Sequence, residues 1–101
     1  MAKWQITDKR KGYLTKELAI DRGFGRKTRG EIHILKVTGY TKPRYGVIGK
    51  LYDTKQIGLT KGDEGLTKEH RYRVYNYAKR ETAIRKANAL QKEFNKIAGV
   101  R

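Results

Sequence analysis

Residues 80–98 read RETAIRKANALQKEFNKIA, and the spacing of their apolar side chains decides much of the fold. Five apolar residues recur at intervals of four, three, four and three: Ala83, Ala87, Leu90, Phe94 and Ile97. This periodicity predicts an amphipathic helix over about residues 80–98, with these five residues facing the core. Gly99 supplies a stop, and Lys96 suits the negative end of the helix dipole. The opposite face is polar with a basic bias: Glu81, Arg85, Asn88, Lys92 and Asn95.

The residues just before this helix predict a strand. Residues 70–77 read HRYRVYNY, a run rich in aromatic and β-favouring residues that contains neither Gly nor Pro. Because side chains alternate along a strand, Tyr72 and Val74 share one face. The other face carries Arg71, Arg73, Tyr75 and Tyr77.

Two further β-rich runs, Glu31–Thr38 and Tyr45–Asp53, flank the sequence GYTKPR at residues 39–44. Its Gly and Pro favour a hairpin connection between two antiparallel strands. A short fourth strand is expected around Gln56–Thr60. The predicted fold class is therefore α+β, with three or four antiparallel strands packed on a C-terminal helix.

The first thirty residues give weaker signals. Trp4 and Ile6 favour the start of a strand, and the spacing of Leu14 and Leu18 favours a short helical stretch after Thr15. Residues 23–30, GFGRKTRG, predict a flexible loop with three cations and one aromatic side chain. We expect residues 1–101 to form a single domain in which residues 1–30 are a partly mobile basic arm.

Charge is the strongest indicator of function. The chain has 101 residues, with 25 Lys and Arg against 10 Asp and Glu, and a formal net charge of +15. Such an excess repels itself unless a polyanion neutralises it, and nucleic acid is the commonest polyanion in a cell. The excess lies mainly in residues 1–30 and 71–101. The alternative is a solubilising surface that has no partner.

The cysteine content and the distribution of apolar residues indicate the cellular location. The chain has no cysteine, which excludes disulfides, thiolate zinc sites and cysteine nucleophiles. Residues 1–11 lack the apolar run of a signal peptide, and no stretch approaches the roughly 18–20 apolar residues of a membrane span. We therefore expect a cytoplasmic, nucleoid-associated protein without a membrane partner.

Catalytic chemistry has little support. Catalysis needs positioned acid–base groups or an activated nucleophile, and the chain offers two histidines and ten scattered carboxylates. His33 and His70 have no partner at metal-ligand spacing, so structural or surface roles are expected for both. The pair Asp63-Glu64 is expected in a loop, too isolated for a metal site. We predict no enzyme activity, no metal and no cofactor.

The glycine-rich segment is the first candidate contact with phosphate. It resembles a phosphate loop only superficially, because Ile20 and Arg26 occupy the positions of that motif's first Gly and its Lys. Its glycines nonetheless allow close backbone approach. The side chains expected to meet phosphates are Arg26, Lys27 and Arg29; the alternative is a solvated run of charge.

The strand at residues 70–77 is the more specific candidate. Its predicted face of Arg71, Arg73, Tyr75 and Tyr77 combines guanidinium groups for phosphate or guanine with rings that stack on unpaired bases. Two alternatives stay open: the tyrosines cover Lys and Arg stems on a solvent-facing strand, or they belong to the core and Tyr72 is exposed. Lys42 and Arg44, at the predicted hairpin tip, are further candidate contacts.

One stretch also resembles a known family. Residues 71–95 contain Tyr-Arg-Val-Tyr and then KRETAIRKANAL at residues 79–90, similar to the end of AP2-like DNA-binding domains and of phage integrase N-terminal arm-type domains. The resemblance covers about a quarter of the chain. It implies a three-stranded sheet, packed on the helix, whose exposed face enters the DNA major groove. Arg71 and Arg73 would then lie on the reading face.

These observations predict a small basic DNA-binding protein, a regulatory or accessory factor, with duplex DNA as its partner. One alternative is an RNA-binding protein of ribosomal type, because a short, glycine-interrupted basic chain also suits folded RNA. A second is a phage-type modulator whose basic surface binds an acidic patch on a host protein. An enzyme acting on nucleic acid comes last.

Overall fold

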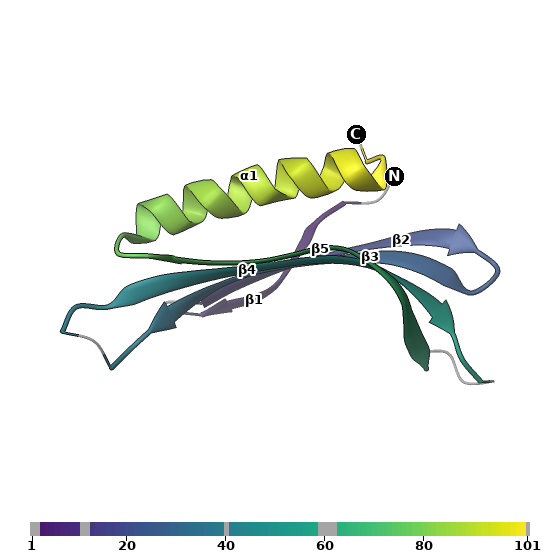
Figure 1. Ribbon diagram of the computed structural model, residues 1–101, viewed down its shortest axis with the longest axis horizontal. Coiled ribbons are helices and arrows are strands. Elements are labelled where there is room, and N and C mark those ends of the chain that lie inside the picture. Colours follow the sequence, from purple (N-terminus) through teal and green to yellow (C-terminus); the bar gives the residue numbers. More distant parts are fainter. Residues whose placement is uncertain (1–2, 11–12, 40, 59–62, 101) are drawn as a thin grey trace.

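Five antiparallel strands form a single sheet, and one helix lies across one face of it (Figure 1). The structure is a computed structural model that describes residues 3–10, 13–39, 41–58 and 63–100. In chain order the elements are β1 (Gln5–Arg10), β2 (Tyr13–Gly23), β3 (Arg26–Val37), β4 (Arg44–Gln56), β5 (Glu64–Tyr77) and α1 (Arg80–Ala98). Each strand pairs with the one before it, so β1 and β5 are the edges. The α+β class is confirmed, but the sheet has five strands, not three or four.

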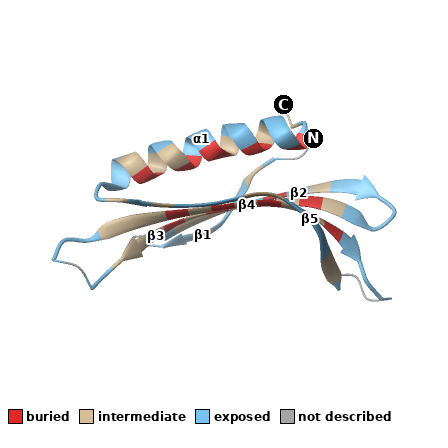
Figure 2. Cartoon of the chain, viewed as in Figure 1, coloured by how far each residue is buried: buried red, intermediate tan, exposed pale blue. Residues whose placement is uncertain are grey.

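The helix begins and ends where its sequence predicts. Four of the five expected residues are buried, namely Ala83, Ala87, Leu90 and Phe94. The prediction that Ile97 faces the core is wrong, because its side chain is 37% exposed and Ala98 is the buried residue of the last turn. Gly99 adopts a left-handed conformation with φ 75° and ends the helix as expected. The buried stripe packs on β3, β4 and β5 (Figure 2).

The central strands supply the other half of the core. Burial alternates along β3 and β4, so that Ile32 and Ile34 from β3 meet Val47 and Leu51 from β4 beneath the helix. Gly49 sits among them, and a Cβ there would lie 3.0 Å from both the Leu90 Cδ1 and the Phe94 Cζ atoms. This glycine therefore lets the two largest buried side chains of the helix approach the sheet backbone.

Trp4, near the N-terminus, packs against the core beside Phe94. Its indole Nε1 donates a hydrogen bond to Asn95 Oδ1 at 2.6 Å, and its ring stacks on Phe94 with centroids 6.3 Å apart. A Cβ on Gly30 would lie 2.7 Å from the Trp4 ring, so the ring needs a glycine beneath it. The residue before β1 is thereby fixed to the last turns of α1.

The N-terminal third differs most from expectation. The strand expected at Trp4 and Ile6 exists as β1, but the predicted helical stretch after Thr15 is wrong, because residues 13–23 form β2. The predicted loop over residues 23–30 is also wrong beyond its first residues, since β3 begins at Arg26 and Gly23 pairs with Arg26. Residues 5–10 and 13–30 thus lie in the sheet and its β2–β3 turn, rather than in a mobile arm.

The strands predicted at Glu31–Thr38, Tyr45–Asp53 and residues 70–77 are correct in place but too short, because β3, β4 and β5 are each longer. The hairpin at residues 39–44 is confirmed, with Val37 paired to Arg44, although Tyr40 lies outside the described residues. The fourth strand expected at Gln56–Thr60 is not found in its described part: Gln56 ends β4, residues 57 and 58 are in no strand, and 59–60 lie outside the described residues. Glu64, expected in a loop, begins β5.

Two bulges bend the last strand. His70 and Thr67 are extra residues in β5 relative to β4, where the register shifts at Leu51/Tyr52 and Asp53/Thr54. Bulges bend a strand and increase its twist. Figure 1 accordingly shows the far end of the β4–β5 hairpin curving away from α1.

Candidate nucleic-acid interface

The sheet has two sides of different chemistry, which the strand register separates. We call the side on which α1 lies the helix side and the opposite one the open side. Leu18, Gly30 and Leu51 are paired across β2, β3 and β4 and face the helix, so every second residue from them shares that side. The bulges in β5 shift this alternation between Leu66 and Arg71.

The open side is balanced in charge. Its carboxylates are Asp8, Glu17, Asp21, Glu31, Glu64 and Glu69, six of the ten in the chain. Its cations are Lys3, Arg10, Lys27, Arg29, Arg44 and Lys50. A surface whose positive and negative charges cancel offers little attraction to a polyanion.

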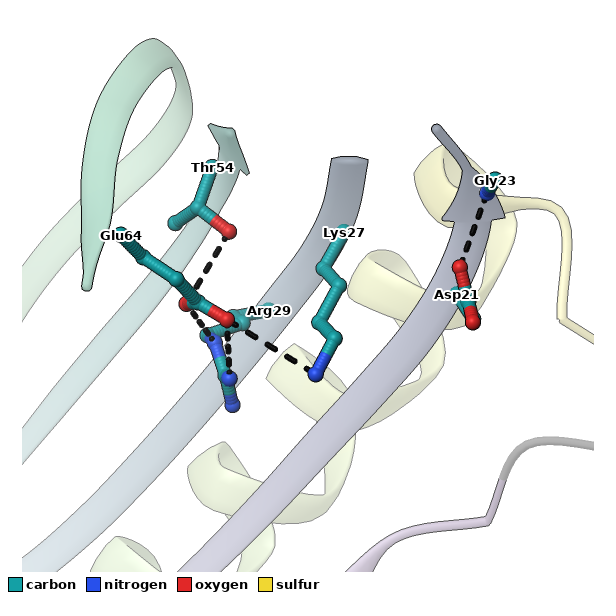
Figure 3. A network of polar contacts seen from close by, with 6 residues as sticks. All are labelled: Asp21, Gly23, Lys27, Arg29, Thr54 and Glu64. Carbon is teal, nitrogen blue, oxygen red and sulfur yellow. Dashed lines mark hydrogen bonds and ion pairs between the residues drawn. The ribbon is translucent and has the colours of Figure 1, made fainter. Parts of the chain in front are cut away.

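Glu64 organises the strongest ion-pair network on the open side (Figure 3). Arg29 binds its carboxylate with two hydrogen bonds of 2.6 and 2.7 Å, Thr54 donates a third, and the Lys27 ammonium lies 3.7 Å away. The bond from Arg29 is the main reason that the pKa of Glu64 falls from 4.5 to about 2. The same bond raises the pKa of Arg29. Two of the predicted phosphate contacts, Lys27 and Arg29, are therefore engaged with a carboxylate.

A second polar group lies beside it. The Tyr52 hydroxyl donates to Glu31 at 2.8 Å, and His33 lies 3.4 Å from the same carboxylate. Burial, followed by this hydrogen bond, raises the pKa of Tyr52 to about 12. A hollow of about 730 Å³ on the open side is lined by Glu31 and Tyr52 together with Arg29, Thr54 and Glu64.

The helix side carries a large excess of positive charge. Its cations from the sheet are Lys9, Lys16, Arg22, Arg26, Lys36, Lys55, Lys68, Arg71 and Arg73. Those from the helix and the residue before it are Lys79, Arg80, Arg85, Lys86, Lys92 and Lys96. The carboxylates of this side are Asp53, Glu81 and Glu93. We call these cations together the helix-side basic surface.

Few of these cations are neutralised. Within the described residues, Arg71 is the member of this surface that forms an ion pair, with its Nε 3.7 Å from Glu93. Asp53 is occupied by other groups: burial would raise its pKa, but hydrogen bonds from Thr28 and His70 outweigh burial and lower it. Most positive charge on this side is therefore available to an external anion.

A groove runs between β1–β3 and the start of α1, with a volume of about 780 Å³. Its cationic lining residues are Lys9, Arg10, Lys16, Lys36 and Arg80, and no carboxylate lines it among the described residues. Its other lining residues are Ile6, Tyr13, Leu14 and Tyr45. We call it the Lys16 groove; cations combined with half-exposed rings suit a phosphate backbone and its sugars.

The strand at residues 70–77 is arranged as one of the open alternatives describes. Arg71, Arg73, Tyr75 and Tyr77 do share a face, but Tyr75 and Tyr77 are half-buried against the core under α1. Tyr72 is 49% exposed on the open side. The four residues therefore form no exposed reading face. The family resemblance implied Arg71 and Arg73 on the exposed sheet face, and they lie instead on the helix side.

The other predicted contacts are scattered. Arg26 is exposed on the helix side, whereas Lys27 and Arg29 point to the open side from the same strand. Lys42 is exposed in the β3–β4 turn, and Arg44 donates a hydrogen bond to Asn76 at 2.6 Å. Of the predicted contacts, Arg26, Arg71 and Arg73 share the helix side, as separate parts of a larger basic surface.

Sequence reasoning missed the Lys16 groove. Residues 14–20 also alternate, with Leu14, Leu18 and Ile20 on one side, and this period of two was the signal that would have predicted β2 and placed Lys16 beside the helix.

Neither metal chemistry nor a membrane span is indicated by the described residues. No three of their His, Asp and Glu side chains are grouped to hold a metal ion, and their one helix is not apolar enough to cross a bilayer. Comparisons with protein-family models, with curated proteins and with solved structures gave no match to this chain.

Proposed function

We propose that this protein binds duplex DNA through its helix-side basic surface and acts as a regulatory or accessory factor rather than as an enzyme. The observation that supports the proposal is the segregation of charge: the helix side is strongly positive and the open side is balanced. Attraction to phosphates supplies most of the affinity of non-specific binding, so the surface that holds the excess cations is the one to test.

The shape of this side favours a duplex. Helix α1 has 19 residues and stands on the sheet, with cations on both flanks: Lys9, Lys16 and Lys36 toward β1–β3, and Lys68, Arg71 and Arg73 along β5. The B-DNA major groove is wide enough for one α-helix, and a phosphate backbone runs along each of its edges. The exposed helix residue Asn88 would then face the bases, and the longer side chains of Arg85 and Lys92 would reach the phosphates at the edges of the groove.

The test compares equal losses of charge on the two sides. Arg80→Gln/Arg85→Gln removes two exposed helix-side cations, and Lys3→Gln/Lys50→Gln removes two from the open side. Mobility shifts of duplex DNA across a salt series measure the slope of log affinity against log salt. We expect the first variant to flatten this slope by about two units and the second to leave it nearly unchanged, since each phosphate contact contributes about 0.9.

Equal effects of the two variants would show attraction by net charge alone and would contradict the proposed surface. Absence of binding to DNA at low salt would contradict the function itself. Structured RNA run in parallel distinguishes the ribosomal-type alternative, which predicts that RNA is the tighter ligand.

A further inference from the structure

Phe24 is the most exposed large apolar side chain of the described chain. It lies at the tip of the β2–β3 hairpin and is 100% exposed, without a contact that could stabilise the fold. Burying a side chain of this size is worth roughly 1.5–3 kcal/mol, so leaving it in water gains nothing for the isolated protein. The flanking residues, Gly23 and Gly25, provide no apolar neighbour.

The backbone at Phe24 is strained as well. Gly23 pairs with Arg26, so Phe24 and Gly25 form a two-residue turn, and both have positive φ, 56° and 74°. Such a turn normally takes Asn, Asp or Gly at its first position, because those residues tolerate the left-handed region. Phe has no such tolerance. Phe24 therefore lowers stability twice, through its left-handed backbone and through an apolar ring exposed to water. Strain of this kind persists where it serves a function.

The turn is held firmly enough to present the ring. The Gly23 amide donates to Asp21 Oδ1 at 2.8 Å, and the Gly25 carbonyl accepts a hydrogen bond of 2.8 Å from the amide of Gln56 on β4. These hydrogen bonds hold both sides of the turn in place. Binding an aromatic partner here therefore loses less conformational entropy than it would in a mobile loop.

The surroundings of the tip are cationic. A hollow of about 470 Å³ beside it is lined by Arg22, Arg26 and Lys55, which belong to the helix-side basic surface, and by Lys27. The carboxylate in that lining, Asp53, is occupied by Thr28 and His70. Arg22 donates hydrogen bonds to Thr28 and to the Ala98 carbonyl, and Lys27 lies beside Glu64, so Arg26 and Lys55 are the cations of this lining that are most available to an anion. An exposed ring next to such cations is the combination that binds a base together with its phosphates.

We infer that Phe24 stacks on a nucleobase when nucleic acid lies on the helix-side basic surface, and that it favours a site where a base is unpaired or a base step opens readily. This inference rests on the proposed function. The neighbouring Arg26 and Lys55 hold the phosphates on either side of the contact, and the ring supplies an interaction with the base that is independent of sequence.

Phe24→Asn tests the inference, because Asn suits the turn while removing the ring. The probe is a DNA duplex with one unpaired 2-aminopurine, whose fluorescence is quenched by stacking. We expect the affinity of Phe24→Asn for this duplex to fall by about 5- to 150-fold and the quenching to be lost, because stacking on one base is worth about 1–3 kcal/mol. Phe24→Trp should retain both. The melting temperature of Phe24→Asn should equal or exceed that of the wild type, which separates this loss from misfolding.

Leu66→Ala is the matched control, since it removes an exposed apolar side chain from the open side and should leave affinity and quenching unchanged. If Phe24→Asn binds the probe as tightly as the wild type while the salt dependence persists, the inference is wrong and the proposed function stands. Vesicles of anionic phospholipid provide the second arm. Binding to vesicles that depends on Phe24, with DNA binding unaffected, would overturn the inference in favour of a lipid contact.

Discussion

The two sides of one sheet differ in almost every physical property, although the same strands supply both. The helix side buries Ile32, Val47 and Leu51 under α1 and surrounds them with cations that mostly lack carboxylate partners. The open side exposes Leu66 and Val74, 66% and 58% respectively, among charges that neutralise one another. The difference shows that the helix side holds both the apolar core and most of the positive charge that no carboxylate neutralises. The side chains of the open side are joined by hydrogen bonds and ion pairs, such as those of Glu64 with Arg29 and Lys27.

The largest expected effect comes from the same substitution made on each side. Leu90→Ala removes a buried side chain from beneath the helix and should lower the free energy of unfolding by about 2–5 kcal/mol. Leu66→Ala removes an exposed one from the open side and should cost about 0.5 kcal/mol or less. Denaturant unfolding measures both. Similar values for the two variants would mean that the open side is covered in solution.

The Glu64 network should make the open side sensitive to acid. Because the pKa of Glu64 is lowered to about 2 in the folded state, its contribution to stability is present above about pH 4.5 and is lost as the pH falls toward 2. We expect Glu64→Gln to lose about 1–3 kcal/mol at pH 7 and to show a weaker dependence between those pH values. Thermal melts from pH 2 to 7 measure the difference. Parallel profiles for the two proteins would contradict the network.

Single lysines should also separate the two sides. Lys92 is exposed on α1, and Lys27 lies beside Glu64 on the open side. Lys92→Ala should flatten the salt dependence of DNA binding by about one unit, since one phosphate contact is lost. Lys27→Ala should change it much less, because Lys27 already faces a carboxylate. The reverse order, measured by mobility shift, would assign the contact to the open side.

The smallest effect is expected at Tyr52. Tyr52→Phe removes the hydrogen bond to Glu31 and should cost about 1 kcal/mol or less. It should also remove, from an ultraviolet titration of the tyrosines, the component with a pKa of about 12. Loss of a component with the ordinary tyrosine pKa of about 10 instead would show that the hydroxyl is not bound to Glu31 in solution.

The elements that the sequence predicted well are those with one consistent period. The helix at residues 80–98 has a single apolar stripe, and the core of β4 alternates without interruption. In β2 the pattern is ambiguous, because Leu14 and Leu18 are four residues apart and fit both a helical turn and every second residue of a strand. Pairing with β3 decided the outcome, and no local pattern contains that information.

The candidate site was harder to predict for a related reason. Which face of residues 71–77 is covered depends on where α1 lies, and both faces carry an aromatic residue. Arg29 and Glu64 are 35 residues apart, and they meet only because two hairpins bring β3 and β5 onto either side of β4. The composition predicted a strongly basic protein. Predicting how that charge is divided between the two sides of the sheet would have required the register of the strand pairs, which the composition does not contain.

The bond between Trp4 and Asn95 bears on the order of events during folding. Every strand pairs with its neighbour in the chain, so the sheet can grow hairpin by hairpin, whereas this bond joins residues 91 positions apart. Closing so long a segment costs more entropy than closing any hairpin here, and the contact also needs α1 already docked. Trp4 is the one tryptophan in the chain, so its fluorescence should follow the closing of the chain into a loop and lag behind sheet formation measured by circular dichroism in a stopped-flow experiment.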